Sequence, residues 1–92
     1  MLYVMEWKIK DGCMEKAVGQ FISTGAPMPE GSTLLGRYHA PGSVNGWLIV
    51  ETDDPTTLYH HASEWGELLS WNTTPVLSDE QAGVTASKVW KQ

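Results

Sequence analysis

The 92-residue sequence is poor in cysteine and in basic residues, and it has no long apolar run. Cys13 is the one cysteine, which excludes an intramolecular disulfide and a cysteine metal cluster within one chain. Six Lys and Arg residues stand against eleven Asp and Glu residues, and the net charge of -5 opposes binding to nucleic acid or to an anionic membrane. No stretch approaches the roughly 20 apolar residues of a membrane span. We therefore expect a cytoplasmic protein with no nucleic-acid or membrane partner.

Phenylalanine is scarce as well, with one residue, whereas the chain has five Trp and three Tyr residues. Trp and Tyr each carry a polar atom that needs a partner when it is buried, so they are typical of interfaces and lined pockets. The length predicts a single domain over residues 1–92. A chain of this size buries only roughly 60 to 65% of its unfolded surface, so a core shared with a second copy would stabilise it.

Apolar periodicity and turn residues predict seven elements in the order strand, helix, strand, strand, helix, strand, helix. The strands are predicted at 2–9, 33–40, 46–52 and 71–77, and the helices at 11–24, 54–69 and 78–90. This order is that of the ferredoxin-like βαββαβ fold, an α+β fold with a four-stranded antiparallel sheet, here with an extra C-terminal helix.

Capping residues support the three helices. Asp11 is predicted to cap the first helix and Gly25 to end it. Asp54 is the predicted cap of the second helix. Ser78 and Gln81 have the spacing of a capping box at the start of the third.

Both faces of the predicted sheet carry large apolar side chains. Alternation in the first strand places Tyr3, Met5, Trp7 and Ile9 on one face, and the opposite face also begins with apolar residues. Helices cover one face of a ferredoxin-like sheet, so a second sheet would have to cover the other. The sequence therefore predicts a homodimer in which two open sheet faces pack together as a dimeric α/β barrel.

Several segments also resemble a known family. They are the opening MLYVMEW, Met28 to Gly31, Glu51 to Pro55, Trp65 to Leu69, and Pro75-Val76. Together they resemble a small uncharacterised family, a domain of unknown function that is grouped with the dimeric α/β-barrel, ferredoxin-like proteins. The resemblance implies that fold and a dimer, and it names no catalytic residue.

The chain departs from this family at His61, where the resemblance implies a large apolar or aromatic side chain, and in its longer C-terminal helix. It is similar, more loosely, to cofactor-independent monooxygenases and to haem-degrading or stress-response proteins that share the dimeric barrel. A shared fold does not transfer their function.

The second predicted helix holds the densest cluster of reactive side chains. At about 100° per residue, His61 lies within roughly 40° of Trp65 and borders the apolar stripe, where an imidazole can act as acid or base. Glu6 is a candidate hydrogen-bond partner for His61, and an outward position for Glu6 at the end of the first strand is equally possible. His60 faces the other way with Glu64, which indicates a solvated polar face or two ligands of a metal site. A metal would need a further ligand from elsewhere, so no metal and no cofactor are expected.

The candidate ligand-binding residues are Trp7, Arg37, Trp47 and Trp65, and the candidate catalytic residues are His61 and His39. Trp7 and Trp47 lie on central strands and either line an aromatic cavity or fill the dimer interface. Arg37 and His39 share a strand face that can bind an anionic group, although Arg37 is equally typical of a charge that protects a sheet edge.

Three functions remain open from the sequence. The first is a homodimeric barrel that binds a small apolar or aromatic molecule or a protein partner. The second is a cofactor-independent enzyme, monooxygenase-like or isomerase-like, that uses His61 or His39 as a base. The third is a metal-binding module at His60.

Overall fold

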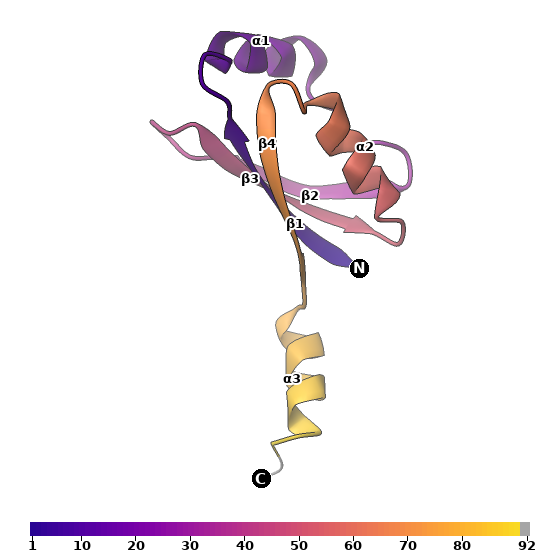
Figure 1. The fold of residues 1–92 in the computed structure, drawn as a ribbon. Coiled ribbons are helices and arrows are strands. Elements are labelled where there is room, and N and C mark those ends of the chain that lie inside the picture. The colour runs from indigo at the N-terminus through magenta and orange to yellow at the C-terminus, as the bar shows by residue number, and fades with distance from the viewer. Residues whose placement is uncertain (91–92) are drawn as a thin grey trace.

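The computed structural model of the chain describes residues 1–90. The elements follow the predicted order (Figure 1): β1 (Leu2–Ile9), α1 (Met14–Thr24), β2 (Ser32–His39), β3 (Asn45–Thr52), α2 (Thr56–Glu64), β4 (Leu69–Val76) and α3 (Asp79–Ser87). The four strands form one antiparallel sheet in the order β2-β3-β1-β4. The predicted α+β fold, βαββαβ with a C-terminal helix, is confirmed.

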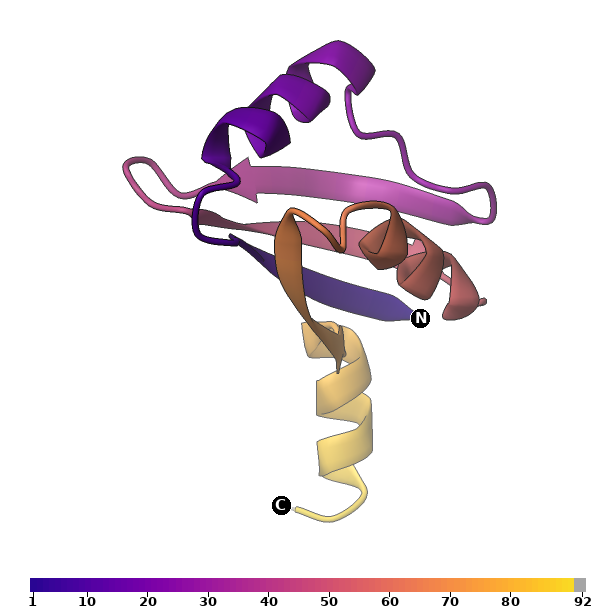
Figure 2. The same cartoon turned by 45° about the horizontal axis from the view of Figure 1, so that its top comes forward.

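Helices α1 and α2 lie over the same face of the sheet (Figure 2). The hydrophobic core lies between these helices and that face. Met5 on β1 and Leu48 and Val50 on β3 are almost completely buried on this face. Ala17 of α1 and Leu58 of α2 close the core from the helix side. The sheet therefore has a helix-covered face and an open face.

The register of β1 and β3 places Trp7 and Trp47 on different faces of the sheet. Trp7 lies opposite Gly46, and Trp47 lies opposite Glu6. Because side chains alternate along a strand, Trp7 lies on the helix-covered face and Trp47 on the open face. The prediction that Trp7 and Trp47 together line one cavity or fill one interface is therefore wrong, because they lie on opposite faces of the sheet.

The first helix begins later than predicted. Its N-terminal cap is Cys13, which makes no side-chain capping bond, so the prediction that Asp11 caps this helix is wrong. Asp11 instead lies in a turn with Gly12, whose φ of 79° requires glycine and delays the helix. The end of the helix is as predicted, because Gly25 is left-handed and its N–H donates to the carbonyl of Phe21.

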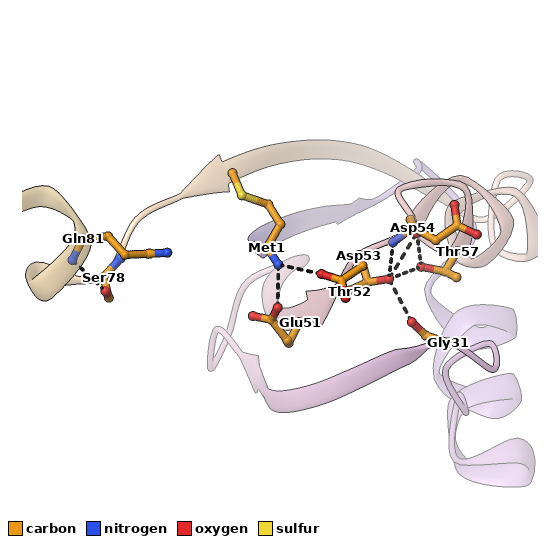
Figure 3. Close-up of polar contacts among 9 residues, drawn as sticks. All are labelled: Met1, Gly31, Glu51, Thr52, Asp53, Asp54, Thr57, Ser78 and Gln81. Atoms are coloured by element: carbon orange, nitrogen blue, oxygen red, sulfur yellow. Dashed lines mark hydrogen bonds and ion pairs between the residues drawn. The ribbon is translucent and has the colours of Figure 1, made fainter. Parts of the chain in front are cut away.

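Polar contacts around Thr52 fix the connection from β3 to α2 (Figure 3). The Thr52 hydroxyl donates to the carbonyl of Gly31 at 2.8 Å and accepts from the N–H of Asp54. The Asp54 carboxylate accepts from the N–H of Thr56, the first residue of α2, at 3.0 Å. Pro55 lies between them at the cap position, and the predicted capping role of Asp54 is therefore carried by this one bond. Thr57 adds a hydroxyl bond to the Asp54 carbonyl.

The second and third helices are both shorter than predicted. Helix α2 ends at Glu64, so Leu69 begins β4 instead of continuing the helical stripe. Helix α3 ends at Ser87, and the capping box of Ser78 and Gln81 at its start is confirmed (Figure 3). It projects beyond the end of the sheet (Figure 1) and buries none of its residues. Among residues 1–90, no helix has both the length and the apolar character needed to cross a membrane.

Candidate functional site

A cavity of about 320 Å³ lies between the helix-covered face of the sheet and helices α1 and α2. Most of its wall is apolar, with aliphatic side chains from β1, α1 and β3 and aromatic rings from β1, α1, β4 and the end of α2. Five of the six residues that the sequence marks as site candidates line it: Trp7, Arg37, His39, His61 and Trp65. The fold thus brings candidate side chains from two strands, β1 and β2, and from the α2 region to one place.

Trp47 and Glu6, which the sequence also singles out, lie elsewhere. They are neighbours across β1 and β3 on the open face of the sheet, whereas His61 belongs to a helix on the other face. Of the two positions that the sequence allows for Glu6, beside His61 or turned away from it, the structure shows the second, because the sheet itself separates the two side chains.

Aromatic rings build one end of the cavity. The ring of His39 stands between Trp7 and Phe21, with centroids 5.1 Å from each. Trp7 is tilted against Trp71 at 6.4 Å, and His61 meets Trp71 edge to face at 5.7 Å. These separations and angles are those that aromatic pairs prefer. The wall is therefore a continuous chain of ring contacts.

Sequence reasoning did not assign Phe21 and Trp71 to the site. In the sequence, Phe21 lies at helical spacing from Ala17 and Val18 on an apolar face of the first predicted helix, and Trp71 begins the fourth predicted strand. Their spacing shows that they face inward. It does not show that the space between α1, α2 and the sheet is left unfilled, which is what makes them cavity residues.

His61 is almost completely buried, with 2% of its surface exposed. Its Nδ1 has no hydrogen-bond partner and lies 4.0 Å from Oε1 of Glu64, too far for a hydrogen bond. Burial lowers the pKa of His61, and the positive charge of Arg37 lowers it further, against the opposing effect of the Glu64 carboxylate. The imidazole is therefore neutral at neutral pH, the form that can accept a proton.

Arg37 reaches the cavity because of a β-bulge between Leu34 and Gly36 of β2. Beyond the bulge, Arg37 lies opposite the buried Leu48, on the helix-covered face. Its guanidinium donates to the carbonyl oxygens of Gly25 and Ala26 at 3.2 and 2.6 Å. These bonds tie the loop after α1 to the sheet.

The guanidinium of Arg37 also lies 5.7 Å from the centre of the Phe21 ring, within the range of a cation–π contact. Burial lowers the pKa of Arg37. Within the part of the chain that the structure describes, Arg37 forms no ion pair, so the cavity wall contains a cation that no carboxylate balances.

A second buried polar atom accompanies His61 Nδ1. The indole Nε1 of Trp71 is enclosed and has no hydrogen-bond partner. An unpartnered buried donor costs about 1–3 kcal/mol, and such groups are uncommon in folded proteins. The wall therefore combines apolar rings, a neutral imidazole and a cation, which suits a molecule with an apolar body and a polar end.

The polar face of α2 does not extend the site to a metal. His60 Nε2 lies 3.7 Å from Oε1 of Glu64, and both side chains are exposed. Among residues 1–90, no three His, Cys, Asp or Glu side chains converge as a metal site requires. A metal-binding module at His60 would thus lack a third ligand from the described chain.

Comparison with known proteins places the chain in a family. A comparison with curated proteins and one with solved structures each gave no significant match. One family model matches residues 1–89, nearly the whole chain. The chain therefore belongs to the family described as a domain of unknown function (DUF3303).

Proposed function

We propose that this protein binds a small apolar or aromatic molecule in the cavity under α1 and α2. The observation that carries the proposal is the ring-lined wall of Trp7, Phe21, Trp65 and Trp71 around an unfilled space of about 320 Å³. Ligand pockets usually measure about 300–1,000 Å³ and are mostly apolar with a few polar groups. This volume is at the lower end, which suits a molecule of one or two rings.

Filling the cavity tests this proposal. Ala17 is buried on α1 and lines the cavity, so Ala17→Leu places extra atoms in the space that a ligand would occupy. The matched control is Ala82→Leu on α3, which is exposed. We expect indole to shift the amide NMR signals of cavity residues in the native protein and in the Ala82 variant, and not in the Ala17 variant. Shifts that persist in the Ala17 variant would place binding elsewhere.

A second candidate is a cofactor-independent enzyme, monooxygenase-like or isomerase-like, with His61 or His39 as the base. The specific observation in its favour is the neutral, buried imidazole of His61, with Nδ1 4.0 Å from the Glu64 carboxylate. A small movement of Glu64 would let it accept a hydrogen bond from Nδ1–H. Nε2 would then be the basic nitrogen.

Proton abstraction can be tested without the natural substrate. Exchange of the acidic methyl protons of acetophenone with deuterated water is followed by NMR, with His61→Gln and His39→Gln as variants. General-base catalysis contributes about 10²–10⁴-fold, so loss of the true base should reduce the rate by a factor of that order. Native protein that leaves the exchange at the buffer rate would count against this enzyme.

We also propose that the open sheet face joins two copies as a dimeric α/β barrel. Helices α1 and α2 both lie on the other face, and the open face carries partly buried Val4, Trp47 and Ile49 with the more exposed Tyr38. Apolar side chains that gather on one uncovered face are typical of a surface that packs against another protein. A different protein partner would be an alternative occupant.

Light scattering with matched variants tests the dimer. Native protein should have twice the monomer mass of 10.2 kDa at micromolar concentration. Trp47→Glu on the open face should give monomers, and Tyr59→Glu, on the exposed surface of α2, should not. A native monomer would contradict the proposal, and a dimer that survives Trp47→Glu would place the interface on another surface.

A further inference from the structure

The cavity wall has one full charge, and it is positive. Arg37 lines the cavity, and none of the other described residues that line it is Asp, Glu or Lys. The chain as a whole has a net charge of -5, so the charge of Arg37 is opposite in sign to the net charge of the protein. Surface charges commonly keep a protein soluble, but that role does not explain a charged Arg37 side chain in the apolar wall of a cavity.

The hydrogen-bonding capacity of Arg37 is only partly used. A guanidinium has five N–H donors, and two of them bind the carbonyls of Gly25 and Ala26. Three donors remain for another acceptor. A desolvated cation is stabilised by an anion held through paired hydrogen bonds, and a guanidinium matches the two oxygens of a carboxylate.

The loop that holds Arg37 is built to keep the guanidinium in place. Gly25 has a φ of 71°, and Ala26 has a φ of 46°, which L side chains rarely adopt. Ala26 is nevertheless buried on the cavity wall, and its carbonyl accepts the shorter of the two Arg37 bonds. With the Phe21 ring beside it, the guanidinium is positioned before any ligand arrives.

We propose that the ligand of this cavity is a small carboxylic acid with an aromatic or aliphatic body, whose carboxylate pairs with Arg37 while its body packs against Trp7 and Trp71. The inference rests on the proposed binding function and adds the charge class of the ligand. Phosphate fits less well, because a doubly charged group would meet a single cation in an apolar space.

Ligand binding should also change the protonation of His61. The charged or titratable groups that face His61 are Arg37 on β2 and His60 and Glu64 on its own helix, and His39 on β2 lines the same cavity. The cavity residues of α1, β1 and β4 are uncharged. Arg37 disfavours the protonated imidazole, so a carboxylate that neutralises Arg37 would raise the pKa of His61.

Matched probes separate charge from shape. Phenylacetate and phenylacetamide have the same body and differ in charge, and inorganic phosphate is an anion without a body. A hydrogen-bonded ion pair of this kind should make phenylacetate bind about ten to a hundred times more tightly than phenylacetamide in NMR titrations of the native protein. The NMR signals of His61 report its pKa in the same samples. This pKa should rise when phenylacetate binds and should not change when phenylacetamide binds.

Two variants then assign the effect to Arg37. Arg37→Gln should reduce the affinity for phenylacetate to that for phenylacetamide and abolish the pKa change at His61. Lys8→Gln is the control, because it removes the same charge from an exposed position on the open face of the sheet and should leave both quantities unchanged. If Arg37→Gln does not fold, the ratio of the two native affinities still decides the matter.

The outcomes distinguish this inference from the proposed function. Equal native affinities for phenylacetate and phenylacetamide would overturn the carboxylate inference and leave an apolar binding site. Phosphate that displaces phenylacetate at equal concentration would overturn the carboxylate class in favour of an inorganic anion. No binding of either aromatic probe, with indole also unbound, would overturn the proposed function itself.

Discussion

Replacing His61 with leucine should stabilise the protein at neutral pH. His61 is 2% exposed, and its Nδ1 has no hydrogen-bond partner. A buried polar atom without a partner costs about 1–3 kcal/mol, whereas an apolar group of similar shape at the same position is nearly neutral. Leucine is close in size to histidine and suits the apolar surroundings. We therefore expect the free energy of unfolding to rise by about 1–2 kcal/mol.

The gain should increase as the solution becomes acidic. Burial first, and then the charge of Arg37, lower the pKa of His61 in the folded protein. Below about pH 6.5, the unfolded chain therefore binds a proton that the folded chain does not bind until the pH reaches the lowered value. The free energy of unfolding of the native protein therefore falls as the pH drops from about 6.5 to that lowered value. Leucine does not bind a proton, so the His61→Leu variant should not lose this part of its stability.

Urea unfolding followed by tryptophan fluorescence measures both effects, at about pH 7.5 and about pH 5.5. His60→Leu is the matched control, because His60 is adjacent and exposed and should not produce the gain. A His61→Leu variant that is less stable than native protein at the higher pH, with an unchanged urea dependence, would refute the reasoning. It would show that native His61 is satisfied in the core.

Two further predictions concern packing and capping. Gly46→Ala should destabilise the protein by about 1–3 kcal/mol, because the new Cβ would overlap the Trp7 ring and the Tyr38 carbonyl. In Gly19→Ala, the new Cβ on α1 meets open space, so this variant should be more stable than native protein by about 0.4–1 kcal/mol. Thermal midpoints of the Gly46 and Gly19 variants that shift in the same direction would contradict this account. Asp54→Ala should lower the midpoint at neutral pH, whereas Asp11→Ala, at a position that caps nothing, should not. Bonds from Thr56 lower the pKa of Asp54, so the difference should vanish as the pH falls through that lowered value, and a difference that persists in acid would exclude the cap as its cause.

The order of elements was predictable because each rests on a local signal. Gly25 ends α1 and the Ser78 capping box begins α3, and neither depends on tertiary contacts. The end of α2 was not predictable in this way. Leu69 continues the helical spacing from Leu58, but it lies at the start of β4, where pairing with Ile9 of β1 overrides the helical pattern.

The position of His61 beside the apolar stripe was also predictable from the helical period, and the structure buries it there. Its surroundings were not. Whether Glu6 or Glu64 lies nearer depends on which face of the sheet α2 covers, and alternation within one strand does not specify that face. The same ambiguity placed Trp47 with Trp7, because two central strands of unknown register leave the relation between their faces undetermined.

The charge in the cavity follows from the register of β2. Leu34 lies opposite Val50, which is fully buried on the helix-covered face. Three residues later, strict alternation would place Arg37 on the open face, because an odd separation reverses the side. The bulge between Leu34 and Gly36 adds one residue, and Arg37 then lies opposite Leu48 on the helix-covered face. The bulge therefore does more than bend the strand, because it sets the face of the sheet on which Arg37 lies. With Leu35 deleted, Gly36 would follow Leu34 directly, and the separation from Leu34 to Arg37 would be even. Arg37 should therefore stay opposite Leu48, and the variant should keep any preference of the cavity for a carboxylate.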